Sequence, residues 1–279
     1  MRREREHAEH ARLRSRYGSW AVVTGASSGI GRALAERVAE AGIHVVLVAR
    51  RADVLDAFAE ELRTRHGVHA RPLAVDLATP DGAAAVSAAT ADLDVGLLVA
   101  AAGFGTSGRF VDASLERELA MLDVNCRALV ALCHAFARRL ADRRRGGMVL
   151  LASLVGFQGT PYAAHYAATK AYVQTLADAL HVELAPQGVD VIASAPGPTD
   201  TGFAAAADMR MRVALAPDVV ARATLRALGR RATVLPGLLT KVLTYSLVPL
   251  PRWARTRIMG GVMGRMTRHQ RDARVARPT

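Results

Sequence analysis

From Trp20 to about residue 235, short continuous apolar runs alternate with segments in which apolar residues recur every three or four positions. The first pattern is typical of buried strands and the second of helices. We expect strands at 21–24, 43–49, 70–75, 95–100, 146–152, 189–195 and 233–235, and helices at 30–41, 53–66, from about 80, 114–140, 163–184 and from 217. Asp53 and Ser114 are expected N-caps. Strict alternation with continuous apolar strands predicts an α/β fold, a parallel sheet covered by helices on both faces.

Polar or turn-forming residues follow most of the predicted strands. In a parallel sheet the carboxyl ends of the strands meet at one edge, and ligands bind there. The residues that the pattern places at this edge are Thr24, Arg50, Asp76, Gly103, Ser153 and Pro196. We therefore expect them to share one surface.

Composition and charge divide the chain into three parts. The chain has 279 residues, 51% of them hydrophobic, which suits one large globular domain. Residues 1–16 carry a charge of +3 and residues 241–279 carry +8, whereas 17–240 hold 22 basic and 21 acidic residues. We expect a charged, frayed or weakly helical arm at 1–16, a catalytic domain at 17–237 and a basic amphipathic extension at 238–279. Because the body is nearly neutral, we expect no nucleic-acid partner.

Other features of the sequence indicate a cytoplasmic protein. No uninterrupted apolar run approaches the roughly 20 residues that span a bilayer, and the N-terminus begins with charged residues rather than an apolar signal core. Cys126 and Cys133 are seven positions apart on a predicted helix, too far for a disulfide, so both are expected in the core. Metal-ligand spacing is lacking among His, Cys and carboxylate residues, so we expect no metal.

A glycine-rich turn joins the first predicted strand to its helix. Gly25, Gly29 and Gly31 bring backbone N–H groups and the positive end of a helix dipole to the same place. This arrangement favours a phosphate site, although such a turn can also serve only to reverse the chain. Arg50 ends the second strand, where an acidic side chain would bind the ribose of NAD. Arginine suits a 2′-phosphate, so NADP(H) is the predicted cofactor; a solvated charge is the alternative.

Tyr166 and Lys170 lie four positions apart on a predicted helix and would point the same way. A nearby ammonium stabilises the phenolate, so Lys170 is expected to lower the pKa of Tyr166 and make it a general acid and base. Only two of the 37 basic residues are lysines, Lys170 and Lys241. By itself the spacing could equally belong to a solvated helix face.

Together these motifs resemble the short-chain dehydrogenase/reductase family over about residues 18–235. The segment Thr24-Gly25-Ala26-Ser27-Ser28-Gly29-Ile30-Gly31 resembles its cofactor turn, Asp76-Leu77 its adenine contact, and Pro196-Gly197-Pro198-Thr199-Asp200-Thr201 its nicotinamide segment. Asn125, Ser153, Tyr166 and Lys170 match its catalytic residues, and Ala102 and Gly103 fall in its pocket. One departure is Ala100-Ala101-Ala102-Gly103, where the family has Asn-Asn-Ala-Gly. The missing amides would tie the fourth strand to its neighbours and shape the pocket.

The resemblance implies a single-domain Rossmann-type doubly wound fold and an NADP(H)-dependent oxidoreductase that interconverts a carbonyl and an alcohol. It further implies that Ser153 binds the carbonyl, Tyr166 transfers the proton, Lys170 holds the ribose, and Asn125 positions a relay water. A homodimer or homotetramer is expected. The alternative is a non-catalytic NADP(H)-binding sensor or scaffold.

Two apolar segments, 154–165 and 201–216, are predicted to close over an apolar ketone or aldehyde, although ordinary packing would produce the same composition. The first ends at His165, whose ring should diverge from Tyr166 by roughly 100° and so serve packing more than catalysis. In the extension, Ile258, Met259, Val262, Met263 and Met266 share one helical face among arginines. This face could lie on an anionic membrane surface, cover the substrate pocket or form an oligomer interface.

Overall fold

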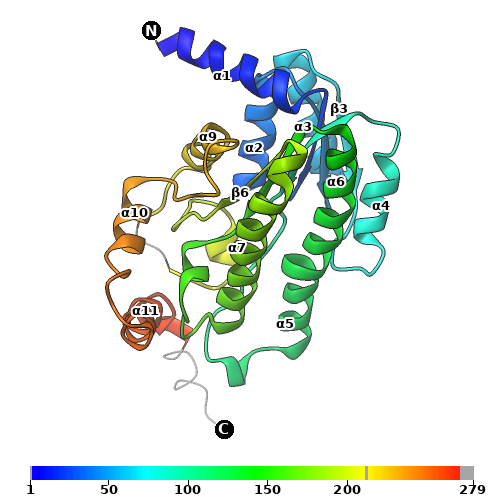
Figure 1. Cartoon of the computed structure of the whole chain (residues 1–279). Coiled ribbons are helices and arrows are strands. Elements are labelled where there is room, and N and C mark those ends of the chain that lie inside the picture. Colours follow the sequence, from blue (N-terminus) through cyan, green and yellow to red (C-terminus); the bar gives the residue numbers. More distant parts are fainter. Residues whose placement is uncertain (1, 211–212, 271–279) are drawn as a thin grey trace.

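The computed structural model describes residues 2–210 and 213–270, and in it seven parallel strands form one sheet in the order β3-β2-β1-β4-β5-β6-β7 (Figure 1). The strands are β1 (Trp20–Thr24), β2 (His44–Ala49), β3 (Ala70–Ala74), β4 (Val95–Ala100), β5 (Gly146–Leu151), β6 (Val189–Ser194) and β7 (Thr233–Val234). Each lies within about a residue of its expected position. The order reverses between β1 and β4, which is the switch point at which doubly wound sheets bind ligands.

Helices cover both faces of the sheet, as predicted. The helices are α1 (Arg2–Tyr17), α2 (Gly29–Glu40), α3 (Ala52–His66), α4 (Gly82–Ala89), α5 (Leu115–Leu122), α6 (Leu129–Arg143), α7 (Ala164–Leu184), α8 (Phe203–Ala206), α9 (Pro217–Ala227), α10 (Leu238–Tyr245) and α11 (Arg252–Met266). Alternate strand residues enter two cores: Val23 packs with the α2, α3 and α9 layer, and Val22 with the α4, α6 and α7 layer. The predicted α/β fold is therefore confirmed.

Two expected helix caps had different outcomes. Ser114 caps α5, since its hydroxyl accepts the N–H of Arg117 at 3.3 Å. The prediction for Asp53 was wrong, because α3 begins at Ala52 with Arg51 at the N-cap. Asp53 lies in the first turn instead, where a carboxylate still interacts favourably with the helix dipole.

The predicted helix at 114–140 consists of α5, a π-helical turn over Asp123–Ala128, and α6. Its span Leu115–Arg143 is long and apolar enough to cross a membrane. Phe136 and Leu140 are nevertheless fully buried against the sheet. This packing is that of a core helix.

The charged N-terminal segment, expected from its composition to be a frayed or weakly helical arm, is a regular helix. It forms α1, which ends in the core with a fully buried Tyr17 whose hydroxyl donates to Asp190 at 2.7 Å. Arg12 donates to the carbonyls of Leu225 and Leu228 at 2.8 and 2.9 Å, near the end of α9. Its attachment to the core was not expected, because the anchoring residues fall at the end of a segment dominated by charge.

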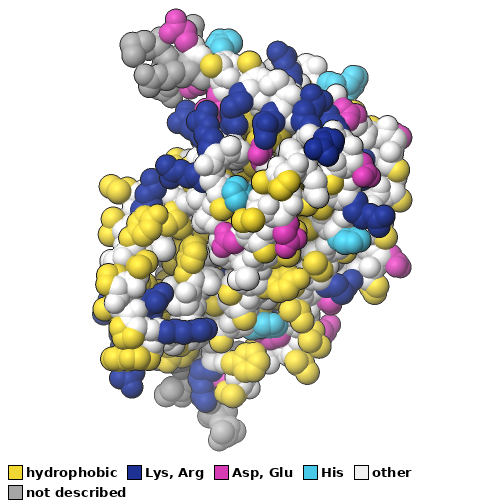
Figure 2. Space-filling view, viewed as in Figure 1, with side chains coloured by type: hydrophobic (Ala, Val, Ile, Leu, Met, Phe, Trp, Pro, Cys, Tyr) yellow, Lys and Arg dark blue, Asp and Glu magenta, His cyan; other side chains and the backbone are white. Residues whose placement is uncertain are grey.

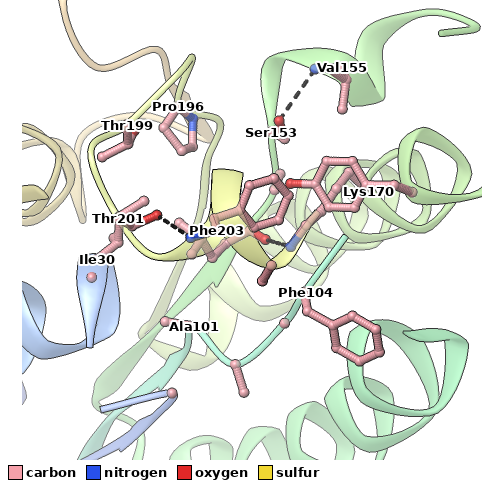
Figure 3. A pocket seen from close by; sticks show the side chains of 18 of the residues that line it. Ile30, Ala101, Phe104, Ser153, Val155, Lys170, Pro196, Thr199, Thr201 and Phe203 are labelled. Atoms are coloured by element: carbon pink, nitrogen blue, oxygen red, sulfur yellow. Dashed lines mark hydrogen bonds between the residues drawn. The ribbon is translucent and has the colours of Figure 1, made fainter. Parts of the chain in front are cut away.

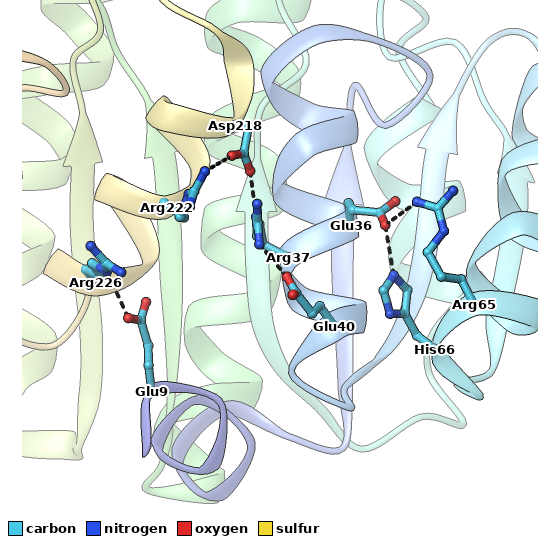
Figure 4. Close-up of polar contacts among 9 residues, drawn as sticks. All are labelled: Glu9, Glu36, Arg37, Glu40, Arg65, His66, Asp218, Arg222 and Arg226. Carbon is cyan, nitrogen blue, oxygen red and sulfur yellow. Dashed lines mark hydrogen bonds and ion pairs between the residues drawn. The ribbon is translucent and has the colours of Figure 1, made fainter. Parts of the chain in front are cut away.

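Ion pairs join the helices on the α2, α3 and α9 side, and Glu9 connects α1 to this layer through Arg226 (Figure 4). Arg37 on α2 pairs with Asp218 on α9 at 2.6 Å, and Glu36 accepts from His66 on α3 at 2.8 Å. Partly exposed pairs of this kind contribute about 0–1 kcal/mol each. They orient the helices, while the buried apolar layer supplies the stability.

Candidate active site

A cavity of about 700 Å³ opens at the carboxyl ends of the central strands. Every residue that the sequence predicted to bind the cofactor lines it: Gly25, Ser27, Ser28, Gly29, Ile30, Gly31, Arg50, Asp76, Leu77, Ala102, Gly103, Tyr166, Lys170, Pro196, Gly197, Thr199 and Thr201. Ser153 and Lys170 border it on one side, and Ile30 and Thr201 on the other (Figure 3). One cavity thus unites residues from seven segments of the chain, Ser153 included.

The glycine turn has the shape that a diphosphate needs. Gly29 has a φ of +57°, and a Cβ there would lie 2.9 Å from the Thr201 side chain. A Cβ on Gly31 would come within 2.3 Å of the Gly25 carbonyl oxygen. The side chain of Ser28, at the N-cap of α2, makes no capping hydrogen bond. The first N–H groups of α2 therefore remain available to phosphate oxygens beside the cavity, which fits a dinucleotide.

Thr24 fixes the turn that lacks the asparagines of the family pattern. Its buried hydroxyl oxygen accepts the N–H groups of Ala101 and Ala102 at 3.1 and 3.0 Å. These bonds hold the turn after β4 against the end of β1. The turn is therefore fixed at the switch point without an amide side chain.

Two arginines lie at the end of β2. Arg50 and Arg51 are exposed and line the cavity, and Arg51 donates to the Ser27 hydroxyl at 3.2 Å. Beyond β3, the Asp76 carboxylate accepts the N–H of Ala78 at 2.9 Å, while Leu77 is buried. This end of the cavity combines an apolar floor with a cationic rim, which suits an adenosine carrying a 2′-phosphate.

Asn125 is fully buried and does not border the cavity. Its amide oxygen accepts the N–H of Phe104 at 3.1 Å, and its amide nitrogen donates to the Phe104 carbonyl at 2.9 Å and to Thr169 at 3.0 Å. The π-helical turn carries it, a feature frequent at functional sites. Asn125 thus ties the loop after β4 to α7 one residue from Lys170.

Ser153, Tyr166 and Lys170 all line the cavity, near the carboxyl end of β5. The side chains of Tyr166 and Lys170 are 8% and 5% exposed, and the lysine Nζ lies 5.9 Å from the tyrosine ring centre. Lys170 donates to the Leu151 carbonyl at 2.7 Å. The Ser153 hydroxyl accepts the N–H of Val155 at 3.5 Å and acts on Tyr166 in the direction that lowers the pKa of the phenol. A hydroxyl, a phenol and an ammonium are therefore grouped in a place largely closed to water.

The expected lowering of the tyrosine pKa was wrong for this arrangement. Burial raises the pKa of Tyr166 to about 12, an effect that Ser153 only partly opposes. Burial also lowers the pKa of Lys170 to about 8, opposed by Cys126. The two values move in opposite directions because removing water disfavours the charged form of each group.

His165 does not border the cavity. Its Nδ1 lies 2.7 Å from the buried carboxylate of Glu118 on α5, so the ring joins α5 to the first turn of α7. Cys126 and Cys133 are buried, unpaired thiols, as expected. Within residues 2–210 and 213–270, no three His, Cys, Asp or Glu side chains could together hold a metal ion.

Apolar side chains close the cavity from three directions. Leu154 and Val155 lie on one segment of the predicted lid, and Phe203 and Met209 on the other; the predicted Met211 lies outside the described residues. The Phe203 ring centre is 5.1 Å from that of Tyr166. The extension adds a third wall, composed of Leu243, Ser246, Leu247, Ile258, Met259, Val262, Met263 and Met266. Its apolar stripe was visible in the sequence, but not the surface that it covers.

The chain belongs to the short-chain dehydrogenase family. The family model for short chain dehydrogenases matches residues 19–211, more than half of the sequence. This assignment agrees with the seven-stranded parallel sheet and with a cavity at its switch point. The chain is thus related to oxidoreductases that act on alcohols and carbonyls.

Three relatives illustrate this similarity. A 7beta-hydroxysteroid dehydrogenase of Collinsella aerofaciens is 31% identical over 81% of this chain and 88% of its own. The structure of a short-chain dehydrogenase from Sphingobium yanoikuyae in complex with NADPH is 34% identical, with a TM-score of 0.77 over 87% of this chain and 95% of its own. A bulky-bulky ketone specific alcohol dehydrogenase from Comamonas testosteroni is 30% identical, with a TM-score of 0.72 over 84% and 95%.

We expect Thr24→Val to destabilise the protein by about 1–3 kcal/mol, because the N–H of Ala102 loses its acceptor and that of Ala101 keeps only the Val99 carbonyl. Thr24→Ser keeps the hydroxyl and should retain most of the stability. Urea unfolding of both variants measures the difference. Equal stability of the valine variant and the wild type would show that the hydroxyl does not hold the turn.

Proposed function

We propose that this protein is an NADP(H)-dependent oxidoreductase that interconverts an apolar ketone or aldehyde and its alcohol through Ser153, Tyr166 and Lys170. The grouping of these three side chains in one buried place, beside a glycine turn shaped for phosphate, carries the proposal. Membership of the short-chain dehydrogenase family supports the reaction class.

Each residue has a role that its chemistry permits. NADPH, when bound, supplies a hydride. The Ser153 hydroxyl donates a hydrogen bond to the substrate oxygen, and Tyr166 gives its proton to that oxygen as negative charge develops there. The Lys170 ammonium stabilises the phenolate that remains and binds ribose hydroxyls. Because the amide of Asn125 is engaged with Phe104 and Thr169, it would order any relay water through the loop that it holds.

The choice of NADP(H) rests on the cationic rim at Arg50 and Arg51. Both side chains are exposed at the end of β2, where they can approach a 2′-phosphate. The relative from Sphingobium yanoikuyae was solved with NADPH, which supports this choice. A guanidinium matches a phosphate with two parallel hydrogen bonds, so it adds specificity as well as affinity.

An apolar and bulky carbonyl substrate fits the three-sided lid. Aromatic, aliphatic and methionine side chains surround Tyr166, among them Phe203, Val155 and Met263. Methionine adapts to irregular apolar shapes. The relatives that act on a hydroxysteroid and on bulky ketones support the same substrate class.

Further proposals concern assembly and location. Leu115, Leu119 and Leu122 on α5 and Tyr172 on α7 are exposed, which supports a homodimer or homotetramer through these helices. We place the protein in the cytoplasm, with peripheral membrane contact through the extension. The alternative, a non-catalytic sensor or scaffold, is supported mainly by the missing asparagines in the turn after β4. Because Thr24 holds this turn in place, we favour the enzyme.

Tyr166→Phe should lower kcat roughly 10²-fold or more, because the proton donor is lost, and leave NADPH affinity unchanged. Tyr172→Phe, an exposed position on the same helix, is the matched control. Stopped-flow oxidation of NADPH and fluorescence titration measure the two quantities. Retained turnover would contradict the role of Tyr166.

Arg50→Ser should weaken NADPH binding roughly tenfold or more and leave NADH binding unchanged, because only NADPH carries the phosphate. Arg65→Ser, which removes a distant surface charge on α3, serves as the control. Dissociation constants for both nucleotides can be obtained by calorimetry. NADH binding as tight as NADPH in the wild type would refute the preference.

The rate of carbonyl reduction should fall as the pH rises through about 8. Burial lowers the pKa of Lys170 to about 8, so above this pH the ammonium loses its proton and its charge. Tyr166, with its pKa raised to about 12, stays protonated over the measured range and should cause no further change in the rate. Measuring kcat/KM from about pH 6 to about pH 10 tests this. A flat profile would show that the Lys170 charge is not needed.

A further inference from the structure

The extension formed by α10 and α11 has two different faces. Its inner face is anchored on the site: Thr240 accepts the N–H of Gly197 at 3.2 Å, and the carbonyl of Met266 accepts the N–H of Arg210 at 3.1 Å. Met259 and Met263 are buried there. Gly260 lets α11 pack closely against the segment before α7, since a Cβ there would lie 3.2 Å from Pro161.

The outer face is apolar and basic. Leu238, Val242, Tyr245, Val248 and Trp253 are exposed, and Figure 2 shows yellow side chains with dark blue ones among them over this side of the molecule. Residues 238–270 contain six basic residues and no acidic one. An exposed apolar patch of this extent marks an interaction site, and its charge fits an anionic partner.

Some residues of the extension line the cavity and are also exposed, which we take to mark the mouth of the cavity. Leu243, Ile258 and Val262 line the cavity, yet they are 39%, 44% and 44% exposed. The same side chains therefore belong to the wall of the site and to the surface. Any partner that covers the outer face also covers an entrance for apolar molecules.

We propose that the outer face of α10 and α11 docks on an anionic lipid bilayer and turns the mouth of the cavity toward the lipid. Leucine, valine and tryptophan side chains would enter the interfacial region, where tryptophan is favoured, and the arginines would meet phosphate groups. A bilayer-dissolved apolar substrate then has a path to Tyr166; this second step rests on the proposed function, whereas docking does not.

Charge separates this partner from a second copy of the chain. In a twofold contact each patch faces itself, so the basic residues of one copy would meet those of the other. Like charges placed against each other oppose such an interface. The leucine-rich surface of α5 carries acidic as well as basic residues and is better suited to self-association.

Co-sedimentation of the full chain with vesicles of phosphatidylcholine, with and without phosphatidylglycerol, tests docking. We expect binding only to the anionic vesicles, weakened by salt. The double variant R252S and R257S should lower the partition constant roughly tenfold or more, and V248S with W253S should do so as well. None of these four residues lines the cavity.

Two matched variants serve as controls. R230S with R231S removes the same charge from the loop before β7, at the opposite end of the sheet, and V182S removes an exposed valine from α7. Both should bind vesicles like the wild type. Equal binding to neutral and anionic vesicles, or equal loss in the controls, would overturn the proposal. So would failure to bind vesicles together with a sedimentation velocity that changes in V248S with W253S, because a second copy would then occupy the face.

Turnover separates docking from the proposed function. On a water-soluble ketone the docking variants should match the wild type, and on a ketone dissolved in anionic vesicles they should be roughly tenfold slower. Loss of NADPH turnover by every protein, with vesicle binding intact, would refute the oxidoreductase and leave docking standing. Equal rates on the dissolved ketone would refute the entry path.

Discussion

The burial of one ammonium group is the constraint on which the site depends. Lys170 is almost excluded from water, and its Nζ is held by the carbonyl of Leu151 at the end of β5. A buried cation is costly unless its donors are satisfied. Strand β5 and helix α7 must therefore stay in one relative position, and Asn125 adds to this by joining α7 through Thr169 to the loop after β4.

The same burial sets the proton chemistry in a way that pair spacing alone did not predict. The argument from the four-residue spacing includes only the attraction between an ammonium and a phenolate, which lowers the pKa of the tyrosine, and leaves out burial. In the structure burial is the largest effect on both groups, and it moves the pKa of Tyr166 to about 12 and that of Lys170 to about 8. Tyr166 is consequently held as a proton donor, which suits reduction of a carbonyl, while the lysine becomes the group sensitive to pH.

Strands and their ends were predictable because each strand is a continuous apolar run with a polar residue or turn after it. From this alone Thr24, Arg50 and Ser153 could be assigned to one edge, where they border or support the cavity. Contacts between side chains far apart in the sequence were not predictable. Tyr17 anchors α1 through Asp190, more than 170 positions away, and the Thr24 hydroxyl holds the turn in which the resemblance to the family leads one to expect asparagines at residues 100 and 101.

The extension shows that an apolar stripe in the sequence predicts burial but does not identify the surface against which it packs. The helical periodicity predicts that Met259 and Met263 are buried, and in the structure they are buried against the cavity. It says less about Leu243, Ile258 and Val262, which belong to two surfaces. Side chains shared by a cavity wall and an exposed patch join substrate access to whatever that patch contacts. If the basic patch docks on an anionic surface as proposed, it ties the entry of apolar molecules to that surface, and a change in surface charge at α11 would act on access rather than on chemistry.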